Sequence, residues 1–266
     1  MSRAPQYFLH VGLIVTGEAE EEHLTKLFGR IAATGLCSFK VLRRIGQLQP
    51  RSSVKRLEMV GQGGRIPTHA EKTISFPSRK FLRHEPGRLL LLIDDLEYKR
   101  RSRAEEIFEL YRGAMDKLLA DDERRRASVH FLVYMLEAYF LADPRAVEES
   151  LGIDCSPPTE DVETIRHAKT EIKKLYPSYR EREHGGKILD AIDLGRVLGD
   201  PQTCAWLRAS VAWLVQALRW GLDKSLHSGL DEIARDCHLD DGRSESLILL
   251  QKPPTSGASA QRRRDP

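Results

Sequence analysis

Apolar residues in the first 145 positions of the chain occur in two alternating patterns. Some form short continuous runs, and others recur three or four positions apart, which is the spacing of an amphipathic helix. The runs predict four strands, at residues 10–15, 37–45, 88–93 and 127–133, of which the second, CSFKVLRRI, is interrupted by polar residues. Helical patterns follow the first, third and fourth of these strands. This alternation is typical of a mostly parallel, doubly wound α/β sheet.

The third strand, RLLLLI at residues 88–93, gives the strongest strand signal because its apolar run has no polar interruptions. Such a run predicts burial on both faces, as in a parallel sheet. The next helix is predicted to begin at Ser102, because Ser102 and Glu105 have the spacing of a capping box. A later helix is predicted after Asp143, which is a natural N-cap followed by Pro144 at the first helical position.

The segment between the second and third strands is mixed. It predicts a short helix around residues 52–60, a glycine-rich loop at 61–65 and a helix interrupted near Pro77. Beyond residue 145 the pattern is helical, with helices predicted at residues 159–176, 187–198 and 203–220. We therefore expect an α/β domain at 1–145, a helical C-terminal part packed on it at 146–240, and a disordered tail at 241–266 that is poor in apolar residues.

Bulk composition excludes two classes of protein. The chain of 266 residues has no apolar run near the roughly 18 residues that a membrane helix needs, so we expect a cytoplasmic protein without membrane contact. Its four cysteines lie far apart in the sequence. This spacing argues against a zinc site or a disulfide framework and fits reduced cytosolic thiols.

Charge is distributed unevenly along the chain, although the net charge is only +3. Residues 40–88 hold twelve Lys and Arg residues and three acidic ones, which gives this segment a charge of +9 and leaves −6 for the rest. A basic segment of this kind attracts a polyanion such as nucleic acid. The alternative is a solvated helical face rich in Lys and Arg, and both interpretations stay open.

Acidic residues follow three of the predicted strands. They are Glu18, Glu20, Glu21 and Glu22 after the first strand, Asp94, Asp95 and Glu97 after the third, and Glu137 after the fourth. Functional sites in open α/β sheets gather at the carboxyl ends of the strands. Carboxylate oxygens prefer hard cations such as Mg²⁺ or Mn²⁺, which neutralise phosphate and activate water. We therefore expect a metal site with Glu18, Glu20, Asp94, Asp95 and Glu97 as ligands, and with Glu20, Asp94, Asp95 and Glu137 as the catalytic groups.

The acids of the first helix also have a simpler explanation, because negative charge in a first helical turn complements the helix dipole. Basic residues are candidates for contact with phosphate or nucleic acid. They are Lys99, Arg100 and Arg101, which follow the acids of the third strand, together with Arg79, Lys80 and Lys187.

Four stretches within residues 8–220 carry a resemblance to a known family. They are VGLIVTGEAEEEHLTKLFGRIA, LLLLIDDLE, MLEAYFLADPRAVEESLG and DAIDLGRVLGDPQTCAWLRASV. The order of strands, helices and acidic strand ends resembles the Toprim fold of topoisomerases, bacterial primases and nucleases of the overcoming-lysogenization-defect type. The stretches are more closely similar to the bacterial family called domain of unknown function 4276. Its E-A-W/Y-x-x-A-D motif is matched by Glu137, Ala138, Tyr139, Ala142 and Asp143.

This resemblance implies a Toprim-like, mostly parallel sheet flanked by helices, and a Mg²⁺- or Mn²⁺-dependent nuclease that hydrolyses DNA or RNA. It also implies an ATPase partner and a role in bacterial defence against phage. Two positions depart from the pattern: Thr16 stands where a glutamate normally precedes the glycine, and Leu96 breaks the usual D-x-D spacing. The alternative is therefore a catalytically degenerate subunit that binds nucleic acid or a partner. A third possibility is a phosphotransfer or nucleotide-processing enzyme that uses the same acids.

Overall fold

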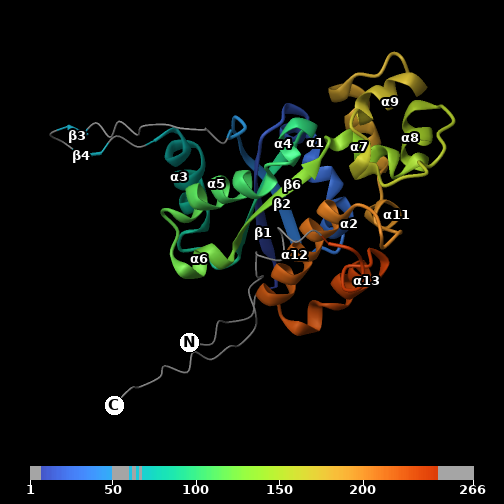
Figure 1. Ribbon diagram of the computed structural model, residues 1–266. Coiled ribbons are helices and arrows are strands. Elements are labelled where there is room, and N and C mark those ends of the chain that lie inside the picture. The colour runs from blue at the N-terminus through green and yellow to red at the C-terminus, as the bar shows by residue number, and fades with distance from the viewer. Residues whose placement is uncertain (1–6, 50–59, 62–63, 66–67, 245–266) are drawn as a thin grey trace.

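A four-stranded parallel sheet forms the centre of the protein (Figure 1). The computed structural model describes residues 7–49, 60–61, 64–65 and 68–244. In the sheet order β2-β1-β5-β6, every neighbouring pair is parallel. The strands are β1 (Leu9–Val15), β2 (Cys37–Arg44), β5 (Arg88–Leu96) and β6 (Ala127–Val133). Their carboxyl ends therefore lie at one edge of the sheet, where β1, β5 and β6 each lead into a helix.

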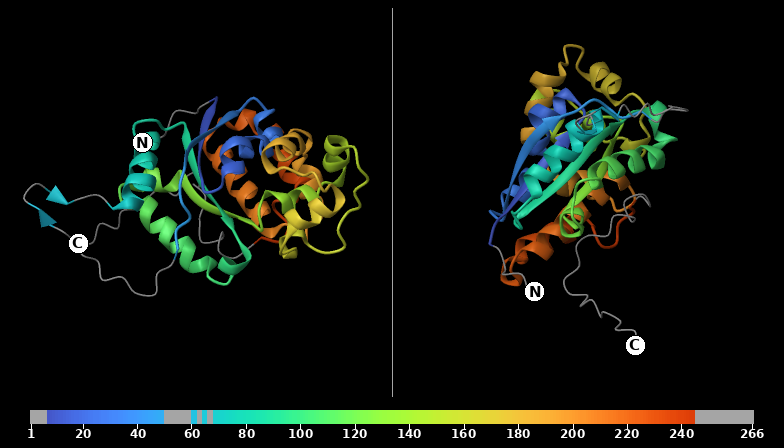
Figure 2. Two further views of the ribbon diagram at one scale, coloured as in Figure 1. Left: turned by 90° about the horizontal axis from the view of Figure 1, so that it is seen from above. Right: turned by 90° about the vertical axis from the view of Figure 1, so that its left-hand side faces the viewer.

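Helices cover both faces of this sheet (Figure 2). One face carries α1 (Glu18–Leu27) and the helical C-terminal part, in which α12 (Ala205–Gly221) packs along β6. The other face carries α3 (Phe76–Leu82) and α5 (Ala104–Asp116).

Strand β5 contributes to both hydrophobic cores because its side chains alternate between the faces of the sheet. Leu89, Leu91 and Ile93 join the core on the α1 face. Leu90 and Leu92 join the core on the α5 face. This is the physical basis of the continuous apolar run, since neither face of the strand is in contact with water.

The remaining elements connect these layers or build the helical C-terminal part. They are α2 (Gly29–Ala32), η1 (Glu71–Ser75), α4 (Tyr98–Arg101), α6 (Asp121–Arg125), α7 (Leu136–Leu141), α8 (Pro144–Leu151), η2 (Val162–Thr164), α9 (Ala168–Leu175), η3 (Glu181–Gly185), α10 (Gly186–Ala191), α11 (Leu194–Val197), η4 (Lys224–Leu226) and α13 (Ser228–Asp236). A two-stranded antiparallel sheet, β3 (Val60–Gly61) with β4 (Gly64–Arg65), lies within the predicted glycine-rich loop.

The predicted fold class is confirmed: the protein has an α/β fold with a mostly parallel, Toprim-like sheet flanked by helices, and with a helical C-terminal part. The helix predicted around residues 52–60 and the tail from residue 245 lie outside the described residues. The division of the chain at residue 145 stays a prediction. In the part of the chain that the structure describes, no helix has both the length and the apolar character needed to cross a membrane.

One predicted helix start is wrong and another is confirmed. The chain already becomes helical at Tyr98, so Ser102 ends the short helix α4, and α5 begins at Ala104 without a side-chain cap. Asp143 does cap α8, since its carboxylate accepts a hydrogen bond from the backbone nitrogen of Ala146.

Candidate functional site: carboxylates at the carboxyl edge of the sheet

The adjacent aspartates of β5 point to opposite faces of the sheet. From the sequence we expected the strand to end before them, at Ile93, and both carboxylates to share one site. The strand instead continues through both residues to Leu96, so the alternation along it separates them. Asp94 lies on the α5 face, and Asp95 lies on the α1 face.

Asp94 forms an ion pair with a cation from its own chain. Its carboxylate is fully buried and accepts hydrogen bonds from Arg100, at 3.2 Å from Nη1 and 2.7 Å from Nη2. Arg100 is buried as well, and it also donates to the carbonyl oxygens of Asp95 and Leu48. Burial raises the pKa of Asp94, while the bonds from Arg100 and Thr16 act in the opposite direction.

Thr16 links the ends of β1 and β5. Its hydroxyl donates to Asp94 Oδ1 at 2.8 Å and accepts from the backbone nitrogen of Asp95 at 3.1 Å. A glutamate here, as in the pattern that this sequence resembles, would place a further negative charge beside Asp94. The hydroxyl of Thr16 forms hydrogen bonds with both groups without adding a charge. It therefore leaves the ion pair between Asp94 and Arg100 undisturbed.

Asp95 is the centre of a second group of acids, which we call the carboxylate cluster: Glu20, Asp95 and Glu137. Their exposed fractions are only 4%, 8% and 4%, respectively. Burial raises the pKa of Asp95 well above its usual value, and repulsion from Glu20, Asp94, Glu97 and Glu137 raises it further. Among the residues that the structure describes, Asp95 Oδ1 has no hydrogen-bond partner although it is buried.

Glu20 reaches the cluster by folding back over the start of α1. A Cβ atom on Gly17 would lie 1.6 Å from Glu20 Oε2, so the place of this carboxylate requires a glycine at position 17. Burial raises the pKa of Glu20, its own backbone nitrogen partly opposes that rise, and the charges of Glu137 and Asp94 add to it.

Glu137 reaches the cluster through a strained turn. Tyr134 and Met135, directly after β6, have φ angles of 61° and 79°, which residues other than glycine rarely adopt. Each such residue costs on the order of 1–3 kcal/mol and persists where the surrounding structure enforces it. The turn places Glu137 in the first turn of α7, where Tyr179 donates to its Oε1 at 3.2 Å and burial raises its pKa. Glu137 also lines a cavity of about 10 Å³, which is the size of a single water molecule.

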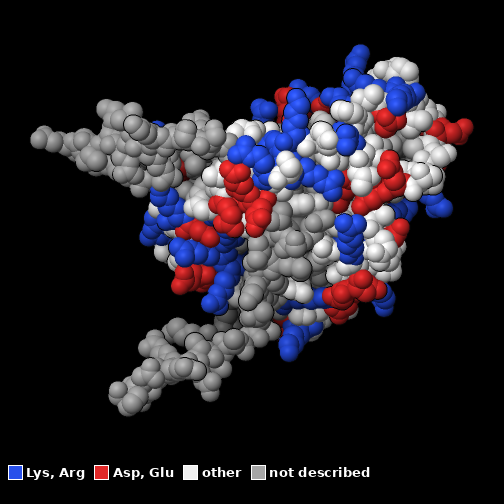
Figure 3. Space-filling model, in the orientation of Figure 1, with Lys and Arg blue, Asp and Glu red and all other residues white. Residues whose placement is uncertain are grey.

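Cations from the helical C-terminal part surround the cluster. The charges of Lys169 and Lys173, on one side of α9, act on Glu137 and lower its pKa against the effect of burial. Arg182 of η3 forms ion pairs with Glu18 and Glu22 of α1. Lys and Arg side chains accordingly gather along the upper edge of the molecule in Figure 3, over the region of α1, α4 and α9.

The other predicted ligands, Glu18 and Glu97, lie at the margin of the cluster. Glu18 is exposed and directed to Arg182, 3.7 Å away. Glu97 is also exposed, and its charge raises the pKa of Asp95.

The structure separates the predicted phosphate-binding residues into different environments. Lys99 is exposed on α4, whereas Arg100 is buried against Asp94. Arg101 donates to Tyr134 Oη at 3.1 Å and to the carbonyl oxygen of Glu163 at 2.8 Å, so it holds the strained turn to the helical part.

The other three predicted basic residues are all exposed but lie on other elements. Arg79 and Lys80 are on α3. The end of α3 packs against the amino edge of the sheet, where the Arg126 side chain before β6 donates to the carbonyl oxygen of Leu82. Lys187 lies on α10, a helix that packs against α1 and α8.

The described residues fit a divalent cation at Asp95 but not at Asp94. The unpartnered buried oxygen of Asp95, between two further carboxylates, has the chemistry of a hard-cation ligand. Both oxygens of Asp94 are already bonded to Arg100. In the conformation of residues 7–49, 60–61, 64–65 and 68–244, no three Asp, Glu, His or Cys side chains are close enough to hold a metal ion. Metal binding would therefore require Glu20 and Glu137 to move toward Asp95.

The buried carboxylate of Glu163 was not predicted from the sequence. Glu163 is 1% exposed and accepts hydrogen bonds from Tyr139 Oη and from the backbone nitrogens of Trp206 and Leu207, at the start of α12. Burial raises its pKa to about 7, although these bonds oppose the rise. A glutamate in a polar stretch gives no signal for this role, because its partners are far away in the sequence.

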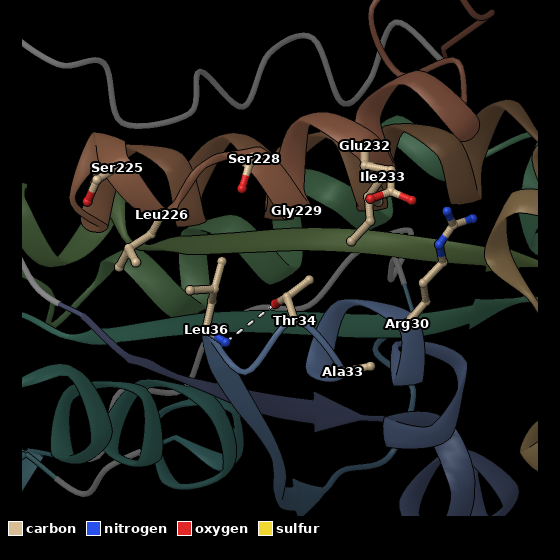
Figure 4. A pocket seen from close by; sticks show the side chains of 10 residues that line it. All are labelled: Arg30, Ala33, Thr34, Leu36, Ser225, Leu226, Ser228, Gly229, Glu232 and Ile233. Carbon is tan, nitrogen blue, oxygen red and sulfur yellow. Dashed lines mark hydrogen bonds between the residues drawn. The ribbon is translucent and has the colours of Figure 1, made fainter.

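Two hollows among the described residues are lined by none of the three carboxylates of the cluster. One of about 450 Å³ lies between α2 and α13 (Figure 4). Its arginine, Arg30, is already paired with Asp236 and Asp193. The other hollow, of about 670 Å³, lies between α7 and α9 and includes Arg166 in its lining.

A comparison with protein families agrees with the resemblance found in the sequence. No curated protein matches the chain. Among solved structures, the C-terminal region of the Xanthomonas campestris pv. campestris OLD protein is similar to 72% of this chain and 92% of its own, with 10% sequence identity and a TM-score of 0.30. The family described as Domain of unknown function (DUF4276) matches residues 17–211. This match spans most of the chain, from the start of α1 into α12, and the protein therefore belongs to that family.

Proposed function

We propose that the protein is a metal-dependent phosphodiesterase that hydrolyses nucleic acid at the carboxylate cluster. The observation that carries this proposal is Asp95, a buried carboxylate with an unpartnered oxygen, whose pKa is raised by the nearby charges of Glu20 and Glu137. Such a group is unfavourable in isolation, because like charges and burial both disfavour its ionised form. A divalent cation removes that penalty, so the arrangement is best explained by the binding of one.

Each residue around the cluster has a role in this proposal. Glu20, Asp95 and Glu137 hold Mg²⁺ or Mn²⁺, which when bound supplies a Lewis acid for the phosphodiester and lowers the pKa of water. Thr16 and Arg100 position β5, because they bind Asp94 and the backbone of Asp95. Lys173 on α9 provides positive charge at the rim for the nucleic-acid backbone.

The test is cleavage of DNA and RNA, single-stranded and duplex, in EDTA, Mg²⁺ or Mn²⁺. We expect cleavage only with a divalent metal, and a loss of more than about 100-fold in Asp95→Asn, because even outer-shell partners of a metal contribute about 10- to 100-fold. Glu18→Gln is the matched control for Glu20→Gln, since both residues lie in the first turn of α1 but only Glu20 is buried. Intact nucleic acid under every metal, with the protein folded, would contradict the proposal.

A second candidate function is a non-catalytic subunit that binds nucleic acid or a partner protein. The observation that favours it is the ion pair of Asp94 with Arg100, which uses one acid of the predicted metal site. In that case nucleic-acid binding depends on salt but not on Mg²⁺, and it persists in Asp95→Asn. Metal-dependent cleavage would exclude this candidate. The ATPase partner and the role in defence stay predictions of the sequence resemblance, and the nucleotide-processing alternative stays a prediction from the acidic strand ends.

A further inference from the structure

A stack of two side chains, Arg166 and Tyr98, links the hollow beside α9 to the chain segment that follows Asp95. The Arg166 guanidinium lies 4.2 Å from the centre of the Tyr98 ring. Tyr98 is 44% exposed and follows Glu97 directly in the chain. Because only two residues lie between Asp95 and Tyr98 in the chain, their Cα atoms are at most about 11 Å apart. The stack is therefore a close neighbour of the proposed catalytic site.

Arg166 belongs both to this stack and to the lining of the hollow. The hollow measures about 670 Å³ and is open to solvent. Its apolar lining includes Leu141, Ile165 and Leu175, and Leu175 is 42% exposed although it is a large apolar residue. A planar cation backed by an aromatic ring, above an apolar floor, is the kind of surface on which nucleobases stack.

The charges around the hollow favour a neutral occupant over an anion. Arg166 and Lys174 contribute positive charge, while Glu160 and Glu171 contribute an equal number of negative charges. Lys174 is moreover paired with Glu171, at 2.7 Å and 2.9 Å to its two oxygens. A phosphate group would meet both carboxylates, whereas the amino groups of a nucleobase can donate hydrogen bonds to them.

We propose that this hollow is a nucleobase subsite, in which an unpaired base of the nucleic-acid strand at the carboxylate cluster stacks on Arg166, with Tyr98 behind it. The inference rests on the proposed function, and it specifies the substrate class as single-stranded nucleic acid. The depth of the cluster supports the same class, because carboxylates that are at most 8% exposed are reached more easily by a flexible strand than by a rigid duplex. A duplex also keeps its bases paired and cannot place one in the hollow.

The test is binding of a fluorescently labelled 12-nucleotide strand, measured by anisotropy in EDTA so that no cleavage is involved. The probes are the single strand, the corresponding duplex, and the same strand with abasic positions. We expect the single strand to bind at least about tenfold more tightly than the other two, which is within the range of a single base stack. Arg166→Lys keeps the positive charge but removes the planar guanidinium. Tyr98→Ala removes the ring on which that guanidinium stacks. Each substitution is expected to remove this preference.

Phe76→Ala is the matched control for Tyr98→Ala, because Phe76 is an aromatic residue of similar exposure, 45% against 44%, on a different helix, α3. Tyr98→Phe keeps the ring and should keep the preference. Equal binding of duplex and single strand, unchanged binding in Arg166→Lys, or no binding of any probe would each overturn the inference. Loss of preference in Arg166→Lys together with retained metal-dependent cleavage supports it. Retained preference without cleavage under any metal would contradict the catalytic proposal but leave the subsite supported.

Discussion

Asp94 and Asp95 are neighbours in the sequence, yet the structure predicts opposite effects when each is changed to asparagine. Asp94 is paired with Arg100 on the α5 face, whereas Asp95 is surrounded by other carboxylates on the α1 face. The substitution removes one negative charge in both cases and leaves the size of the side chain almost unchanged. In Asp94→Asn it leaves the buried Arg100 cation without its counter-ion. In Asp95→Asn it removes repulsion.

The expected changes in stability follow from the burial of the two aspartates and from their hydrogen-bond partners. Breaking a buried ion pair by removing one partner costs about 3–5 kcal/mol, and we expect the lower end because the asparagine oxygen still accepts one bond. At about 2–4 °C per kcal/mol for a chain of this size, the melting temperature should fall by roughly 6–12 °C. For Asp95→Asn, the side-chain oxygen stays but the charge is lost, and relief from burying that charge is on the order of 1–3 kcal/mol. The melting temperature without metal should therefore rise by roughly 2–12 °C at pH 8.

The effect of Asp95→Asn depends on pH in a defined direction. Because the folded-state pKa of Asp95 is raised, this residue lowers the stability of the folded protein increasingly as the pH rises from its ordinary pKa toward the folded-state pKa. The advantage of asparagine should vanish near pH 4, close to the ordinary pKa of aspartate, and grow as the pH rises. Saturating Mg²⁺ should stabilise the wild type, by about 2.7 kcal/mol at 100 times the dissociation constant, but not Asp95→Asn.

The assay is thermal unfolding followed by circular dichroism, in EDTA and in Mg²⁺, between pH 4 and pH 8. The reasoning is refuted if Asp95→Asn lowers the melting temperature in EDTA as Asp94→Asn does. It is also refuted if Asp94→Asn has no effect, since Arg100 would then not depend on its partner.

Two further predictions concern buried polar groups. Thr16→Ala removes the hydroxyl that binds Asp94 Oδ1 and the backbone nitrogen of Asp95. The free energy of unfolding, measured by urea titration, should fall by about 1–3 kcal/mol. Thr16→Ser keeps the hydroxyl and should keep most of the wild-type free energy of unfolding. Glu163 has a folded-state pKa raised to about 7, so its contribution is most favourable below its ordinary pKa and declines as the pH rises through 7. Glu163→Gln should flatten that part of the stability–pH curve, and an unchanged slope would argue against the raised pKa.

The sequence by itself determined the sheet and most of its helical cover. Apolar runs identified β1, β5 and β6, because a strand buried on both faces needs apolar residues at most positions. The partly exposed strand β2 was a candidate from a mixed sequence. The carboxylates at the strand ends were also predicted, because parallel strands place their carboxyl ends at one edge of the sheet. Asp143 was identified as a cap from a local pattern, since a cap bonds to backbone atoms only a few residues away.

Only the tertiary structure decided which of these acids belong together. The sequence pairs Asp94 with Asp95, but the strand extends to Leu96, and its alternation turns the two carboxylates to opposite faces. Arg100 looked like a phosphate contact beside the acids, yet the short helix after β5 folds it back onto Asp94. Tyr98 and Arg166 are 68 positions apart, so no local pattern could have shown their stack. Side-chain direction at a strand end and contacts between distant segments depend on three-dimensional packing, which sequence periodicity does not record.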